Sequence, residues 1–177
     1  MSGAFVLRQR EILREMFGAE VQAQVAAALS PDTSRAVLGA HGNEWVPVAA
    51  VEEFFVAAAR ATKTDVATLH ERVGGLASER TIRTVWRVLM RLTSDAQLMS
   101  QVPVLYRKAW NRGTLTGRMV GTRDSTLELV SWPDVPEFTM RGVKIAVAQA
   151  LALAGRRGAI VTYRRTPDGA SFAVRWS

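Results

Sequence analysis

The sequence predicts an α+β fold in which an N-terminal helical layer is followed by a β-hairpin, a helix and a second β-hairpin. Apolar residues recur at helical spacing over residues 1–112, and from residue 113 they alternate with the two-residue period of strands. The tetrapeptide TPDG at 166–169 is a strong turn signal between the last two strands. We therefore expect one domain, 1–177, with a helical part, 1–112, and a small antiparallel sheet in the hairpin-helix-hairpin part, 113–177.

Three helices are predicted in the first third of the chain. Residues 6–28 have apolar side chains at helical spacing, and Gly18 is a weak point within them. Ser30 suits an N-cap, and Pro31 suits the first position of a short helix that extends over 32–38. Residues 46–62 then form the third helix.

Residues 64–92 continue the helical pattern, with Thr64 as the predicted N-cap and Asp65 in the first turn. Gly74 and Gly75 interrupt it. Glycine in a helix interior costs about 1 kcal/mol relative to alanine, so either the helix breaks there or a neighbour packs closely. Because helical spacing resumes at once, we expect close packing or a kink.

A capping box of Ser94 and Gln97 starts a further helix, which Pro103 bends or restarts and which ends near residues 111–113. Prolines at 133 and 136 end the first hairpin. The remaining predicted elements are strands at 114–120 and 125–131, a helix at 139–154 followed by Gly155, and strands at 159–165 and 171–176.

Residues 78–92 have the clearest two-sided pattern and are predicted to be the central helix. The apolar face contains Ile82, Val85, Trp86, Leu89 and Leu92. The opposite face is an arginine stripe of Arg80, Arg83, Arg87 and Arg91. This stripe could bind an acidic partner or phosphates, and the alternative interpretation is an ordinary solvated helix face.

Composition excludes several classes of site. The chain has 177 residues, a net charge of +7, two histidines and no cysteine, so disulfides, thiolate metal sites and cysteine nucleophiles are ruled out. Nucleotide-binding, hydrolase and zinc-protease motifs are absent. We expect no enzymatic activity, no metal and no cofactor. With no signal peptide and no apolar run near the ~20 residues of a membrane helix, we expect a cytoplasmic protein without membrane insertion.

Aromatic and apolar side chains near the central helix are the candidate ligand site. Trp86, Leu89, Tyr106 and Trp110 could form the wall of an apolar cavity, and the alternative is ordinary core packing. Nucleic-acid binding is a third hypothesis and ranks behind both, because Trp86 lies on the helix face opposite the arginine stripe and could not stack on bases beside it.

Five segments carry a resemblance to a known superfamily. They are ILREMFGAEV (12–21), EWVPVAAVEEFF (44–55), VGGLASERTIRTVWRVLMRLTSD (73–95), YRKAWNRGTL (106–115) and LALAGRRGAIVTYRRTPDGASFAVRW (151–176). The chain resembles the superfamily that unites haem nitric-oxide-binding domains, 4-vinyl-reductase domains and TRAPP subunits, and within it a paralogous myxobacterial branch. The resemblance implies an α+β fold with a small-molecule or lipid cavity, often as a dimer in sensing or scaffolding.

The chain departs from the haem-binding and cysteine-containing relatives. Haem-binding relatives use an axial histidine and a Tyr-x-Ser-x-Arg motif, which neither Tyr106 nor Tyr163 begins. Relatives of the vinyl-reductase branch often carry cysteines in the final hairpin, where this chain has none. The leading hypothesis is a homodimeric regulatory module that binds an apolar small molecule and acts through a protein contact. The alternative is a ligand-free adaptor that binds an acidic protein through the arginine stripe.

Overall fold

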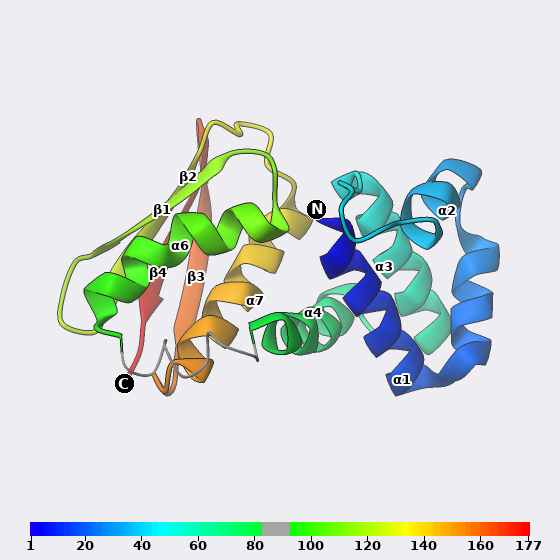
Figure 1. Cartoon of the computed structure of the whole chain (residues 1–177), viewed down its shortest axis with the longest axis horizontal. Helices are drawn as coiled ribbons and strands as arrows, with labels where there is room; N and C mark the ends of the chain where they lie inside the picture. The colour runs from blue at the N-terminus through cyan, green and yellow to red at the C-terminus, as the bar shows by residue number, and fades with distance from the viewer. Residues whose placement is uncertain (83–92) are drawn as a thin grey trace. The chain divides into compact units, whose positions relative to one another are not determined.

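A computed structural model describes residues 1–82 and 93–177. The described residues form six helices and a four-stranded antiparallel sheet, which confirms the predicted α+β class (Figure 1). The chain divides into two compact units, Met1–Ala77 and Ser78–Ser177, and each is described by itself. The assignment of residues 1–177 to a single domain stays a prediction.

The first unit is helical. It contains α1 (Gly3–Ala28), α2 (Pro31–Leu38), α3 (Val48–Thr62) and most of α4 (Val66–Ile82). Helix α1 packs against α2 and α3. Gly18 has a φ of 86° and interrupts the helical geometry of α1, at the position where the sequence predicts a weak point. The apolar side chains buried here include Ile12, Leu13, Phe54 and Phe55.

The carboxylate of Glu53, on α3, holds the beginning of α2. It accepts hydrogen bonds from the backbone N–H of Ser30 (2.7 Å), from the Ser30 hydroxyl (3.0 Å) and from the Thr33 hydroxyl. The Thr33 hydroxyl and then the Ser30 N–H favour the ionised carboxylate and lower the pKa of Glu53 below its ordinary value of 4.5. Glu53 therefore supplies the negative charge that suits a helix N-terminus.

We expect Glu53→Gln to lower the urea midpoint of unfolding at neutral pH. Because folding lowers the pKa of Glu53, its stabilisation is present above the unfolded-state pKa and is lost as the pH falls through the lower folded-state pKa. The difference between wild type and Glu53→Gln should therefore shrink below about pH 4.5, near the unfolded-state pKa of a glutamate. Glu52→Gln, at the adjacent exposed position, is the control. A difference that stays constant down to pH 2–3, well below ordinary carboxyl pKa values, would contradict this role.

The side-chain amide of Gln9, on α1, is fully buried, and neither its nitrogen nor its oxygen has a hydrogen-bond partner among the described residues. A buried unsatisfied polar group costs about 1–3 kcal/mol. We expect Gln9→Leu to raise the free energy of unfolding by about 1 kcal/mol, measured by urea titration. Gln24→Leu, at an exposed position of the same helix, should leave it nearly unchanged. A loss of stability in Gln9→Leu would show that water or a ligand satisfies the amide in solution.

The second unit contains the sheet. Its elements are α6 (Asp95–Ala109), β1 (Thr114–Met119), β2 (Asp124–Val130), α7 (Glu137–Leu153), β3 (Ile160–Thr166) and β4 (Gly169–Arg175). The strand order is β1-β2-β4-β3, and every adjacent pair is antiparallel. Helix α6 packs on β1 and α7 packs on β3, both on one face of the sheet (Figure 1). The buried side chains on that face include Leu115, Leu127, Leu129, Val161 and Phe172.

The predicted strands agree with the observed ones to within two residues at each end. The predicted turn at 166–169 joins β3 to β4, and Gly169 is required at its end. A Cβ atom at Gly169 would lie 2.1 Å from the backbone oxygen of Leu129. Only glycine therefore allows β4 to approach β2 this closely.

The structure decides three local predictions in α4 and α6. The N-cap of α4 is Asp65, whose carboxylate accepts a hydrogen bond from the N–H of Thr68 (2.9 Å), so the prediction of Thr64 was wrong by one residue. Helix α4 continues through residues 74–75, whose two glycines are buried, so the helix does not break there. Pro103 lies inside α6, which does not restart at that position.

Candidate functional site

Two of the four predicted cavity residues, Tyr106 and Trp110, lie on and directly after α6. Both are buried, and their rings stack with centroids 5.2 Å apart and planes inclined by 14°. A spacing of four residues brings side chains together on one face of a helix, which explains the contact. Burial raises the pKa of the Tyr106 hydroxyl well above its ordinary value, so this group stays protonated at neutral pH.

The segment that follows α6 completes this aromatic cluster, which we define as Tyr106, Trp110, Arg112 and Trp132. The Tyr106 hydroxyl donates a hydrogen bond to the backbone oxygen of Arg112 (2.7 Å). The guanidinium carbon of Arg112 lies 5.3 Å from the ring centroid of Trp132, which is within the range of a cation–π contact. The sequence predicted the first two members and missed Arg112 and Trp132, because no periodic pattern connects a loop arginine to a tryptophan twenty residues later.

Close packing fills the space between α6 and β1 at Gly117. A Cβ atom on Gly117 would lie 2.8 Å from Cδ2 of Leu127 and 3.3 Å from the backbone oxygen of Met99. The missing side chain of Gly117 therefore lets α6 lie directly on the sheet.

The other predicted site residues lie largely outside the described residues. Trp86 and Leu89, the remaining cavity candidates, and Arg83, Arg87 and Arg91 of the arginine stripe fall within 83–92. Arg80 is described and is half-buried near the end of α4. The cavity wall and the arginine stripe both remain predictions.

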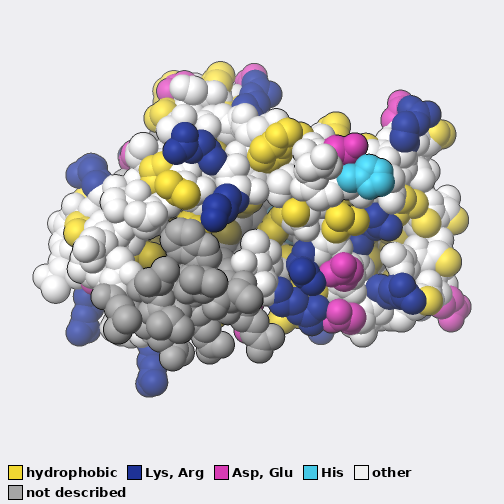
Figure 2. All heavy atoms as spheres, viewed as in Figure 1, with side chains coloured by type: hydrophobic (Ala, Val, Ile, Leu, Met, Phe, Trp, Pro, Cys, Tyr) yellow, Lys and Arg dark blue, Asp and Glu magenta, His cyan; other side chains and the backbone are white. Residues whose placement is uncertain are grey.

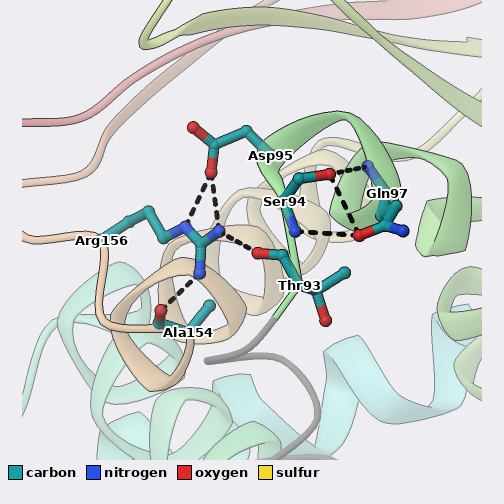
Figure 3. Close-up of polar contacts among 6 residues, drawn as sticks. All are labelled: Thr93, Ser94, Asp95, Gln97, Ala154 and Arg156. Carbon is teal, nitrogen blue, oxygen red and sulfur yellow. Dashed lines mark hydrogen bonds and ion pairs between the residues drawn. The ribbon is translucent and has the colours of Figure 1, made fainter.

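A polar cluster that the sequence did not predict joins the end of α7 to the beginning of α6 (Figure 3). The Nε and Nη2 atoms of Arg156 each lie 2.8 Å from Oδ1 of Asp95. Arg156 also donates to the backbone oxygens of Thr93 (2.6 Å) and Ala154 (2.6 Å). Both side chains of the ion pair are largely buried, with exposed fractions of 14% for Arg156 and 30% for Asp95.

This cluster sits beside the predicted capping box, which is confirmed. The Ser94 hydroxyl accepts a hydrogen bond from the N–H of Gln97 (3.3 Å), and the Gln97 side chain accepts one from the N–H of Ser94 (3.1 Å). The sequence signal was local and could be found by its spacing. The contact between Asp95 and Arg156 joins residues 61 positions apart, so it had no local signal.

Several solved structures with a similar fold are H-NOX proteins. No protein-family model and no curated protein matches the chain. The chain is similar over its full length to Fe(II) unliganded H-NOX from K. algicida, with 9% identity, 97% of that chain covered and a TM-score of 0.74. It is also similar to a mutant H-NOX of T. Tengcongensis (16% identity, 98% covered, TM-score 0.68) and to an H-NOX structure that probes heme distortion (14%, 95%, 0.69). The chain has an H-NOX-like fold.

The unit that contains the aromatic cluster lacks the commonest axial ligand of haem. Haem iron is held by histidine in globins and peroxidases, and by cysteine, methionine or tyrosine in other haem proteins. Both histidines lie in Met1–Ala77: His41 is exposed in a loop, and His70 is buried with its ring 4.8 Å from that of Phe55. In Ser78–Ser177, the hydroxyl of Tyr106 donates to a backbone oxygen, and that of Tyr163 donates to Glu137. The unit Ser78–Ser177 therefore contains neither a histidine nor a cysteine that could bind haem iron.

The described part of the chain contains no group of three or more His, Cys, Asp or Glu side chains that could hold a metal ion. In the same residues no helix has both the length and the apolar character that crossing a membrane requires. Among the described residues of the second unit, the fold brings together the aromatic cluster, the ion pair of Arg156 with Asp95 and the ion pair of Arg175 with Asp124.

Proposed function

We propose that the chain is a non-enzymatic regulatory or sensory module that binds an apolar small molecule or lipid beside α6. The observation that carries this proposal is the buried stacked pair of Tyr106 and Trp110 in an H-NOX-like fold. Trp86 and Leu89 complete the proposed cavity wall. The module acts in the cytoplasm as a homodimer, transmits its state through contact with a protein, and belongs to the myxobacterial branch of the superfamily.

The solved structures support the small-molecule part of this proposal. Two of the similar H-NOX structures are named with Fe(II) or with heme, so those proteins hold a non-protein group. This chain has no cysteine, and its two histidines lie in the first unit. The side chains at the proposed site are apolar and aromatic instead. Pockets of this composition bind apolar ligands and use a few polar groups, such as the Tyr106 hydroxyl, for orientation.

Native mass spectrometry of the freshly purified protein, beside its denatured mass and its visible absorption spectrum, tests the proposal. We expect a dimer that carries excess mass, loses this mass on denaturation, and shows no Soret band. A dimer or monomer of bare mass, unchanged after incubation with a lipid extract, would contradict ligand binding. A Soret band after expression with excess haem precursor would contradict the poor fit to haem.

The alternative remains a ligand-free adaptor that binds an acidic protein through Arg80, Arg83, Arg87 and Arg91. The net charge of +7 is compatible with it. On the side of the molecule seen in Figure 2, however, Lys and Arg side chains occur over both units among acidic and uncharged ones, so positive charge is not confined to this stripe. Reversing Arg83 and Arg87 to Glu should abolish an adaptor contact and leave a ligand site intact.

A further inference from the structure

The face of the sheet opposite α6 and α7, which we call the outer face, presents polar and charged side chains. Strand register places Thr116, Glu128, Ser171 and Arg164 in one row across the four strands, and Arg118, Thr126, Ala173 and Thr162 in the next. Side chains of one strand alternate between the two faces, and those named here are exposed or half-buried apart from Ser171, which is 8% exposed. The outer face bears no aromatic ring among its described residues.

Each acidic side chain of the outer face forms an ion pair or a hydrogen bond, whereas four arginines on this face or at its end form no ion pair among the described residues. Asp124 pairs with Arg175 (2.7 Å), and Glu128 accepts a hydrogen bond from Ser171 (2.9 Å). Arg118 and Arg164 are exposed on the two edge strands. Arg123 and Arg157 are exposed at one end of the sheet, where their backbone oxygens accept hydrogen bonds from the N–H groups of residues 176 and 177. Within the described parts of the chain these four arginines form no ion pair.

The same end of the outer face exposes two aliphatic side chains. Val120, directly after β1, is 53% exposed, and Ile160, the first residue of β3, is 63% exposed. The N–H of Val120 donates a hydrogen bond to the backbone oxygen of Asp124. In the strand register, Asp124 lies opposite Arg175, and Arg175 lies opposite Ile160. Neighbouring strands lie about 4.8 Å apart, so the two aliphatic side chains stand roughly 14 Å apart with the ion pair between them.

We propose that this end of the outer face is a peripheral contact site for an anionic lipid bilayer. Cationic side chains attract the surface charge of such a bilayer, and flanking aliphatic side chains bury apolar area at the boundary of its headgroups. The chemistry disfavours other occupants. A second copy would bring arginines against arginines, and single-stranded nucleic acid binds on aromatic platforms that this face lacks. The site goes beyond the proposed ligand-binding function and does not depend on it.

The test is co-sedimentation of the full chain with phosphatidylcholine vesicles that contain phosphatidylglycerol, beside vesicles of phosphatidylcholine alone. We expect binding only to the anionic vesicles, with a marked decrease between about 0.05 M and 0.5 M NaCl, because salt screens exposed charges. Each arginine near an anionic surface contributes about fivefold to partitioning, so Arg123→Gln with Arg157→Gln should weaken binding by about 25-fold. Ile160→Ser should weaken it further.

The matched control is Arg60→Gln with Arg107→Gln. It removes the same charge from exposed positions on α3 and on α6, the latter on the opposite side of the sheet from the outer face. We expect this control to bind as wild type does. An equal loss in the two double variants would reduce the effect to net charge and overturn the site. Binding of poly-glutamate or of single-stranded DNA without binding of anionic vesicles, or competition by inorganic phosphate at millimolar concentration, would also overturn it.

Discussion

Replacing Arg156 with Ala is expected to lower the free energy of unfolding by about 3 kcal/mol, because one partner of a largely buried ion pair is removed. The substitution removes both contacts of Arg156 with the Asp95 carboxylate and its hydrogen bonds to the backbone oxygens of Thr93 and Ala154. These groups are at the beginning of α6 and the end of α7, so the loss should loosen both helices at this end. Urea unfolding followed by circular dichroism measures the change.

The neighbouring Arg157 gives a control of the same residue type. Its side chain is exposed and forms no ion pair among the described residues, so Arg157→Ala should stay within about 0.5 kcal/mol of wild type. Arg156→Lys should recover only part of the loss, because an ammonium group cannot reach two carboxylate contacts and two carbonyl oxygens in fixed directions. Equal stability of the Arg156→Ala and Arg157→Ala variants would show that the cluster contributes nothing to folding.

Local signals account for most of what the sequence predicted. Ser30 and Pro31, the capping box of Ser94, and the turn before Gly169 each set a boundary through contacts within a few residues, and each boundary is observed. The shift of the α4 N-cap from Thr64 to Asp65 has the same origin. Both residues can cap a helix, and only the three-dimensional path of the chain decides which of them faces the free N–H groups.

Contacts between residues far apart in the chain could not be predicted from the sequence. No local pattern marks Glu53, whereas the fold places its carboxylate at the beginning of α2, more than twenty residues earlier. The same holds for Asp95 with Arg156 and for the charges on the outer face. In each case the sequence shows a charged side chain, and the partner depends on which elements pack together.

At the candidate site the sequence likewise predicts which side chains lie together but not whether they enclose a cavity. Tyr106 and Trp110 were predicted as members of one cavity wall because of their side-chain type, and the structure stacks their rings, as a spacing of four residues allows. Helical spacing gives the direction of a side chain and says nothing about the volume in front of it. Whether Trp110 lines a ligand site or fills the core is therefore a question of energy, which a substitution can answer.

Trp110→Ala is expected to lower the free energy of unfolding by about 4 kcal/mol if the indole only fills the core, since removal of a buried tryptophan leaves a cavity that the structure cannot close. In the proposed site a bound apolar ligand shares that volume. The variant should then lose the excess mass seen by native mass spectrometry and keep its circular dichroism spectrum. The loss of unfolding free energy in Trp110→Ala should also be smaller when the reference is ligand-free wild type than when it is ligand-bound wild type, because bound ligand stabilises only the folded state.

Trp45→Ala provides the comparison, because Trp45 is 46% exposed in the first unit and its removal should cost less than about 1 kcal/mol. Trp110→Phe retains a flat ring against Tyr106 and should preserve both stability and ligand within a small factor. A full loss of about 4 kcal/mol in Trp110→Ala, with no change in bound mass, would place this residue in the core alone. The ligand site would then have to be sought at Trp86 and Leu89, on the other predicted wall.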